Sequence, residues 1–230
     1  MAASGLAREV LDVVRATGSH DVVGLLDDDA ALHGEHVRDV PVLGGLEAVT
    51  AHPDAQLVLC AGRGQARDSL AERLAGLGVA EDRYATVRHP SVDVPGSCTV
   101  GSGTVLLAHV AVTADVRIGR HVVVMPNATL THDDVLEDFV TVCANVALGG
   151  SVHVGERAYL GMGGTVRERL TVGAGATLGM AAALVTDLPP GQTWLGVPAR
   201  PQMPSHVGEL ESSVAGRRRR ATSTARGAES

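Results

Sequence analysis

The residues best suited to proton transfer in this sequence are His132 and the two carboxylates that follow it, Asp133 and Asp134. A neutral imidazole accepts a proton near pH 7, and a neighbouring carboxylate can orient the ring or make it a stronger base. Asp133 is the first candidate for that supporting role, and Asp134 is its rival. On position alone, the competing interpretation is that His132 is a solvated surface residue.

A second group of candidates lies in the N-terminal third, where polar residues follow predicted buried strands. The strand predicted at residues 21–26 ends in Asp27 and Asp28, and the strand predicted at residues 56–61 ends in Gly62. In parallel sheets, ligands bind beyond the carboxyl ends of strands. Carboxylates suit hydrogen-bond donors on a base or ribose, whereas backbone N–H groups such as those of the Gly62 loop suit a pyrophosphate. A solvated acidic strand end is the alternative interpretation.

The element that must position His132 is an internal repeat of six residues. From Val94 to Leu184 every sixth residue is aliphatic, at sixteen positions in a row. A six-residue unit with one buried aliphatic residue and a turn is typical of a parallel β-helix, in which three units form one coil. Stacked aliphatic side chains then form a core that needs few aromatic residues, which here make up 2% of the chain. In this register His132 follows Leu130 and is expected at an outward-facing corner.

The N-terminal region has a different pattern. Residues 6–16 have helical spacing behind a possible Ser4 cap, and predicted strands alternate with helices, which indicates a small parallel α/β layer. A turn is predicted at residues 41–45. The predicted parts are an α/β domain at 1–90, a β-helical domain at 91–203, and an Arg-containing tail at 204–230 that lacks an apolar period and is expected to be disordered.

Composition narrows the function classes. The net charge is -7, and because the tail is basic, residues 1–204 are more acidic still, which argues against binding to nucleic acid. No apolar run is long enough to span a membrane. Three widely spaced cysteines indicate reduced thiols in a cytoplasmic protein. His109 and His121 occupy a different register position from His153, so a zinc site is not favoured.

Several short motifs occur in a fixed order along the chain. They are Ser4-Gly5, Leu26-Asp27-Asp28, Pro41-Val42-Leu43-Gly44, Gly62 with Arg67, His89-Pro90-Ser91, Thr131-His132-Asp133 and Gly196-Val197-Pro198-Ala199-Arg200. Over residues 3–201 this order resembles the bacterial nucleotide-aminosugar N-acetyltransferases and the related sialic-acid O-acetyltransferases. The resemblance implies a mainly β protein, with a left-handed parallel β-helix after a Rossmann-like α/β domain. It also implies a homotrimer and acetyl-CoA as co-substrate.

The same resemblance implies an activity and roles for individual residues. The activity is direct transfer of an acetyl group from acetyl-CoA to the amino group of a nucleotide-linked aminosugar, with His132 as general base and Asp133 as its partner. The implied nucleotide-sugar contacts are Ser4, Gly5, Leu6, Asp27, Asp28 and Gly62. The implied acetyl-CoA contacts are Thr141, Met162, Gly179 and Met180. Two alternatives stay open: O-acetylation of a sialic-acid-like hydroxyl, and a noncatalytic β-helical scaffold or binding subunit.

Three departures from the family pattern affect these expectations. The family's first strand is apparently missing, and Leu6 stands where the family has His. A missing central strand would leave two sheet edges unpaired, so we interpret the departure as a true start codon that lies upstream. Thr141 stands where many relatives have a second His that contacts the acetyl donor, although a hydroxyl can still donate a hydrogen bond.

Overall fold

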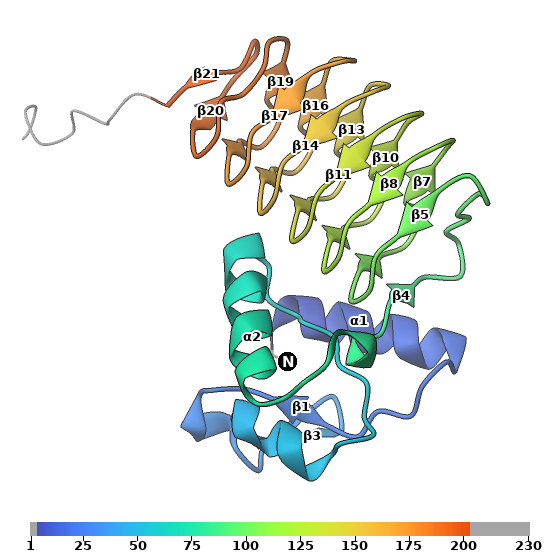
Figure 1. Cartoon of the computed structure of the whole chain (residues 1–230), viewed down its shortest axis with the longest axis vertical. Coiled ribbons are helices and arrows are strands. Elements are labelled where there is room, and N and C mark those ends of the chain that lie inside the picture. The colour runs from blue at the N-terminus through green and yellow to red at the C-terminus, as the bar shows by residue number, and fades with distance from the viewer. Residues whose placement is uncertain (1–3, 203–230) are drawn as a thin grey trace, which may run out of the picture.

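The computed structural model describes residues 4–202, which form an N-terminal α/β region followed by a long stack of short strands (Figure 1). The tail predicted at residues 204–230 lies outside the described residues. Within residues 4–202, no helix combines the length and the apolar character needed to cross a bilayer.

The stack is a left-handed parallel β-helix with three sheets along its sides. Sheet 1 has the order β21-β20-β18-β15-β12-β9-β6-β4, sheet 2 the order β17-β14-β11-β8-β5, and sheet 3 the order β19-β16-β13-β10-β7. The strands are β4 Val87–Arg88, β5 Thr99–Val100, β6 Val105–Leu106, β7 Ala111–Val112, β8 Arg117–Ile118, β9 Val123–Val124, β10 Thr129–Leu130, β11 Val135–Leu136, β12 Thr141–Val142, β13 Ala147–Leu148, β14 His153–Val154, β15 Tyr159–Leu160, β16 Thr165–Val166, β17 Thr171–Val172, β18 Thr177–Leu178, β19 Ala183–Leu184, β20 Thr193–Leu195 and β21 Arg200–Pro201.

The chain turns between sheets at three corners. We name them after the junction with the N-terminal region, the two methionines Met162 and Met180, and His132. The junction corner joins sheet 2 to sheet 1 and includes residues 119–122 and 137–140. The methionine corner joins sheet 1 to sheet 3 and includes residues 161–164 and 179–182. The histidine corner joins sheet 3 to sheet 2 and includes residues 131–134 and, one coil later, 149–152. Because residues 18 positions apart stack, each corner is a column of side chains along the β-helix.

The predicted six-residue register is confirmed. The repeat positions from Leu106 to Leu184 all belong to one buried core, and Val94 and Val100 at the start of the series are partly buried against it. Strand pairing follows the same register, since Leu106 pairs with Val124 and Val124 pairs with Val142. The coil of 18 residues therefore repeats from β4 to β19, and the pairing of Thr177 with Thr193 in β20 is shorter, at 16 residues.

Glycines that directly follow the core positions allow adjacent coils to approach closely. A Cβ added at Gly161 would lie 2.7 Å from the backbone carbonyl carbon of Gly179 in the next coil. The left-handed turn conformation falls two residues further on, at positions such as Asn127 and Asp133, whose φ angles are 59° and 62°. Close packing, rather than turn geometry, therefore explains these glycines.

The N-terminal region begins with the predicted helix. Ser4 caps α1 by accepting a hydrogen bond from the backbone N–H of Ala7 at 3.2 Å, and Gly18 ends it in a left-handed conformation. The predicted turn at residues 41–45 is wrong, because Val40 and Val42 are buried in strand β3. The elements are α1 Gly5–Thr17, β1 Leu25–Leu26, η1 Ala30–Leu32, β2 His36–Val37, β3 Val40–Gly44, η2 Leu46–Ala51, α2 Gly64–Gly76 and η3 Glu81–Arg83.

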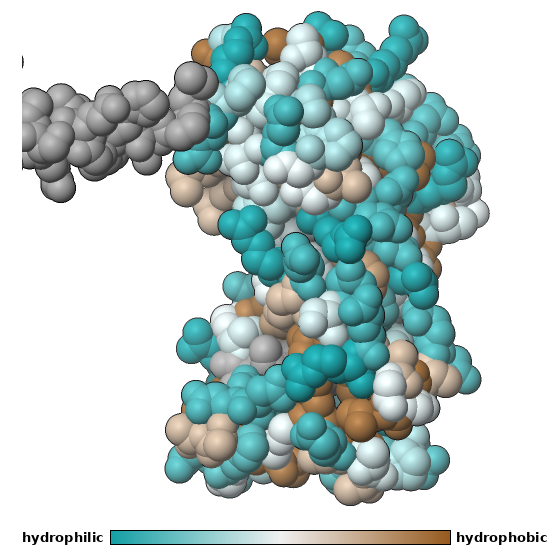
Figure 2. Space-filling view, turned by 60° about the vertical axis from the view of Figure 1, so that its left-hand side comes forward, coloured by the Kyte–Doolittle hydropathy of each residue, from teal (hydrophilic) through white to brown (hydrophobic). Residues whose placement is uncertain are grey.

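The two strands predicted at residues 21–26 and 56–61 form only in part. The first is a strand at β1 alone, which pairs with β3, while the second makes one bridge, between Leu57 and Tyr84. Both segments and the buried face of α1 line a cavity of about 380 Å³. Val22 and Val23 are exposed beside it, and Figure 2 shows hydrophobic residues at the surface of this lower part of the molecule.

The α/β region packs directly on the β-helix. Side chains of α1 share a buried cluster with Val87, Val105 and Val123, which lie on β4, β6 and β9 of sheet 1. Because β4 pairs with β6, the β-helical sheet already starts at Val87, before the predicted boundary at residue 91. The N-terminal region thus covers the first coils on the side of sheet 1 and the junction corner.

Candidate active site

His132 and Asp133 form a hydrogen-bonded pair at the histidine corner, between β10 and β11. Nδ1 of His132 lies 2.8 Å from Oδ2 of Asp133, and the two side chains are 65% and 58% exposed. An ionised carboxylate only accepts hydrogen bonds, so the contact fixes the proton on Nδ1 and leaves the lone pair on Nε2. The pair can therefore remove a proton from a group that approaches Nε2 from solvent.

Asp134 has a different task and does not contact the imidazole. Its side chain is fully buried, and its two oxygens accept hydrogen bonds from the backbone N–H groups of Thr131 and Val152, at 2.8 and 2.9 Å. It thereby ties the corner to the next coil. Burial raises the pKa of Asp134 to about 6, although both N–H groups oppose that shift. Asp133, rather than its rival Asp134, is therefore the residue placed to orient the imidazole of His132.

This buried carboxyl predicts a pH-dependent stability. The pKa of Asp134 is higher in the folded protein than its value of 3.8 in an unfolded chain, so its stabilising contribution is complete below about pH 4 and is lost as the pH rises through 6. At about 1.4 kcal/mol per pKa unit, the loss is on the order of 3 kcal/mol. As the pH is raised from 4 to 8, urea unfolding should show that the free energy of unfolding of Asp134→Asn increases relative to that of the wild type. A constant difference across that range would contradict the prediction; exposed Asp133→Asn is the control.

The residues predicted to contact the nucleotide sugar are only partly available to a ligand. The hydroxyl of Ser4 donates to the carbonyl of Cys60 at 2.6 Å, which joins the start of α1, at Gly5, to the segment before Gly62. Leu6 is buried in the cluster beneath α1, so its side chain faces the core rather than a ligand. Only its backbone can serve a ligand there.

The acidic strand end is partly occupied by protein contacts as well. Oδ1 of Asp27 accepts a hydrogen bond from the backbone N–H of Asp29 at 2.9 Å. Asp28 forms a two-pronged ion pair with Arg73 of α2, at 2.6 and 3.2 Å, and this hydrogen bond lowers the pKa of the Asp28 carboxyl. A ligand that used Asp28 would share it with Arg73.

Arg67 supports the Gly62 loop, a role that the sequence analysis missed. Its side chain is fully buried, and its guanidinium donates to the carbonyls of Ala61 and Gly62 in the predicted pyrophosphate loop. It also donates to carbonyls of the junction corner, at His121, Phe139 and Val140. Burial lowers the pKa of Arg67 to about 10, so it remains charged at neutral pH. Arg67 therefore joins the loop to the β-helix.

Thr141 belongs to this same junction. It is fully buried; its hydroxyl donates to the carbonyl of Gly62 at 2.9 Å and accepts from Arg67 at 3.0 Å. The single hydroxyl proton is therefore already used within the protein. This geometry argues against the expectation that Thr141 contacts acetyl-CoA directly, and places it as a support for the Gly62 loop.

The other predicted acetyl-CoA contacts lie at the methionine corner. Met162 and Met180 are 58% and 78% exposed and stack in adjacent coils, where the N–H of Ala181 donates to the carbonyl of Met162. Gly179 directly precedes Met180, and a Cβ there would meet the side chain of Leu195 at 2.2 Å, so the space beside this glycine is filled by the chain itself. The two exposed methionine side chains are the part of this corner that suits a long, thin ligand.

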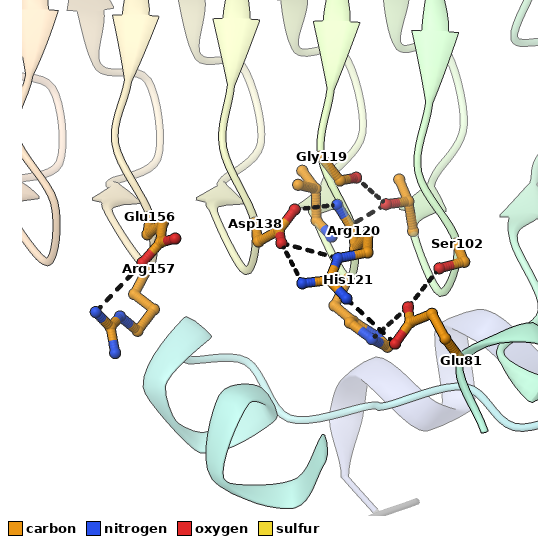
Figure 3. A network of polar contacts seen from close by, with 10 residues as sticks. Glu81, Ser102, Gly119, Arg120, His121, Asp138, Glu156 and Arg157 are labelled. Atoms are coloured by element: carbon orange, nitrogen blue, oxygen red, sulfur yellow. Dashed lines mark hydrogen bonds and ion pairs between the residues drawn. The ribbon is translucent and has the colours of Figure 1, made fainter. Parts of the chain in front are cut away.

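A polar network on the junction corner holds η3 against the β-helix (Figure 3). Arg120 pairs with Asp138 at 2.7 Å and with Glu81 at 3.3 Å. His121 is 1% exposed and stacks on the ring of Phe139, and burial lowers its pKa. It is a packing residue here, and within residues 4–202 no three His, Cys, Asp or Glu side chains are grouped to hold a metal ion.

The three groups of candidate residues therefore lie at three different corners of the β-helix. His132 and Asp133 are at the histidine corner, Met162 and Met180 are at the methionine corner, and the Gly62 loop is held at the junction corner. A single copy does not bring them together.

Comparisons with known proteins agree with this architecture. Residues 1–74 match the family model described as the PglD N-terminal domain. GDP-perosamine N-acetyltransferase of Escherichia coli O157:H7 is 31% identical over 120 residues, which are 50% of this chain and 54% of that protein. UDP-3-O-acylglucosamine N-acyltransferase of Caulobacter sp. strain K31 is 33% identical over 106 residues, or 46% of this chain and 26% of that protein. The chain thus spans between a quarter and about half of the length of these curated relatives.

Solved structures match over nearly their whole length. PerB from Caulobacter crescentus, in complex with CoA and GDP-perosamine, is 31% identical with a TM-score of 0.80, covering 88% of this chain and 95% of that one. The acetyltransferase domain of PglB from Neisseria gonorrhoeae FA1090, in complex with acetyl coenzyme A, is 30% identical with a TM-score of 0.80, covering 87% and 96%.

Proposed function

This chain belongs to the hexapeptide-repeat acyltransferase family, and we propose that it transfers the acetyl group of acetyl-CoA to the amino group of a nucleotide-linked aminosugar. The observation that carries the proposal is the His132–Asp133 pair, with Nδ1 held at 2.8 Å and both side chains open to solvent. The solved relatives named above bind CoA with GDP-perosamine, or acetyl coenzyme A, which supports both substrates.

In the proposed reaction, the sugar amine attacks the thioester carbonyl while Nε2 of His132 takes a proton from the attacking nitrogen. The new C–N bond replaces the C–S bond, and the imidazolium gives its proton to the departing sulfur of CoA. The base is required because the nitrogen carries one proton too many once its lone pair has formed the C–N bond. The carboxylate of Asp133 stabilises the imidazolium that forms, as the 2.8 Å contact allows.

We also propose that the working enzyme is a homotrimer, in which different copies contribute the base and the acetyl-CoA surface. The supporting observation is that His132 and Met162 lie at different corners of one chain, each at the surface. Sedimentation should then give a mass three times that of the 23.6 kDa chain. A monomer with full activity would contradict this.

Free thiols at Cys60, Cys98 and Cys143 fit a cytoplasmic site of action.

A thiol-release assay tests the reaction. Full-length protein is incubated with acetyl-CoA and a panel of nucleotide-linked aminosugars, and matched sugars with a hydroxyl in place of the amine serve as controls. We expect thiol release with at least one aminosugar, together with a product heavier by one acetyl group. Release only with the hydroxyl sugars, or no release from well-folded protein, would overturn the proposal.

A further inference from the structure

The imidazole of His132 packs against the next coil, at a position where the residue of that coil has no side chain. Residues 114, 132 and 150 occupy one column of the histidine corner, as the backbone ladder shows: the N–H of Asp133 donates to the carbonyl of Ala114, and the N–H of Ser151 to that of His132. The neighbour of His132 in the C-terminal direction is therefore Gly150.

The imidazole fills the space that a side chain at position 150 would need. A Cβ added at Gly150 would lie 2.4 Å from both Cε1 and Nε2 of His132 and 3.0 Å from Cδ2. Real Cβ contacts are essentially never shorter than 3.0 Å, so the ring would have to move. These three His132 atoms are the nearest neighbours of that position.

The backbone itself does not require glycine here. Gly163 and Gly175 have positive φ angles of 68° and 65°, but Gly150 is not among the residues with positive φ. Its φ therefore lies outside the left-handed region that favours glycine, and the contact with the imidazole is the obstacle to a side chain at this position.

We propose that Gly150 is a positioning residue for His132. This inference rests on the function proposed above. Two contacts then define the base. The bond to Asp133 at 2.8 Å fixes which nitrogen carries the proton, and the bare backbone of Gly150 lets the ring lie along the coil with Nε2 beside it. A side chain at position 150 displaces Nε2 and strains the bond to Asp133.

The test is Gly150→Ala, made alone and together with His132→Ala. Because misplacing a reacting group by about 1 Å can cost roughly 100-fold in rate, we expect Gly150→Ala to lower kcat by about 10- to 100-fold, with KM for acetyl-CoA within about two-fold. In the His132→Ala background the imidazole is gone, so adding Gly150→Ala should change neither kcat nor the melting temperature. Gly96→Ala is the control, because a Cβ there meets no atom within 4 Å.

A spectroscopic readout separates this inference from the proposed reaction. In ¹⁵N spectra, the ring of His132, assigned by its loss in His132→Ala, should show the proton mainly on Nδ1, and Gly150→Ala should shift it toward the mixture found in solution. If the wild type has no turnover but the shift occurs, the reaction is wrong and the positioning holds. Unchanged ring signals, or equal slowing by Gly150→Ala with and without His132, would overturn the inference.

Discussion

Replacing His132 with alanine is expected to lower kcat by about 10²- to 10⁴-fold while the fold and the assembly persist. The loss follows from removing the proposed base, the imidazole that Asp133 holds at this corner. The fold should tolerate the change because the side chain is 65% exposed and its partner Asp133 is 58% exposed. Neither a core cavity nor a buried unpaired group results. Steady-state thiol release gives kcat, and circular dichroism with sedimentation checks the fold and assembly.

The matched control is His153→Ala. His153 also contacts a carboxylate, with Nε2 lying 2.7 Å from Oε1 of Glu137, and is 48% exposed, but it lies on β14 of sheet 2 rather than at the histidine corner. We expect its kcat to stay within about two-fold of the wild type, since it lacks a role in proton transfer. Equal losses in the two variants would mean that the effect is general, and wild-type turnover in His132→Ala would remove His132 from the reaction.

The β-helix was predictable because single residues at regular intervals define its register. One aliphatic residue in every six is enough to identify which side chains stack, and Leu106 to Leu184 all reach the core. The same register also contains a signal for Asp134 that was overlooked. It stands two positions before Leu136, where neighbouring units have small apolar residues such as Val122, Val140 and Val152, all buried. An acidic residue in that row is expected to be buried.

The N-terminal region was less predictable because its structure depends on contacts that have no period. Residues 21–26 are apolar enough to be a buried strand, yet only Leu25 and Leu26 pair, and the rest line a cavity. Pro41 suggested a turn, but it lies in β3 opposite His36. A short strand of this kind is defined by its neighbours, and local propensity does not reveal them.

The role of Arg67 was hidden for a related reason. An arginine in a helix is usually solvated, and nothing local shows that the first turn of α2 packs against the β-helix. The contact depends on residues more than 50 positions away, at His121, Phe139 and Thr141. Gly64 permits it, since a Cβ there would lie 2.1 Å from the carbonyl oxygen of Phe139. The sequence shows that residue 64 is glycine, but only the fold shows that a side chain there would meet the backbone of the β-helix.

Replacing Arg67 with methionine is therefore expected to destabilise the protein strongly. Methionine keeps most of the apolar length but leaves the buried carbonyls of His121 and Phe139 without the donor that serves them, whereas Gly62 keeps the Thr141 hydroxyl and Val140 keeps the N–H of Val123. Unsatisfied buried groups cost about 1–3 kcal/mol each before relaxation, and we expect a total loss of about 3–5 kcal/mol in the free energy of unfolding. For a chain of this size, that lowers the melting temperature by about 10 °C.

Arg73→Met is the matched control, because Arg73 lies on the same helix but its ion pair with Asp28 is at the surface, with side chains 47% and 50% exposed. Losing this exposed ion pair should leave the melting temperature close to that of the wild type. Arg67→Lys adds a functional readout. An ammonium group cannot serve all the acceptors of a planar guanidinium, so the Gly62 loop should loosen, which raises KM for the nucleotide sugar but not for acetyl-CoA. If Arg67→Met melts as Arg73→Met does, the guanidinium does not hold the two parts together.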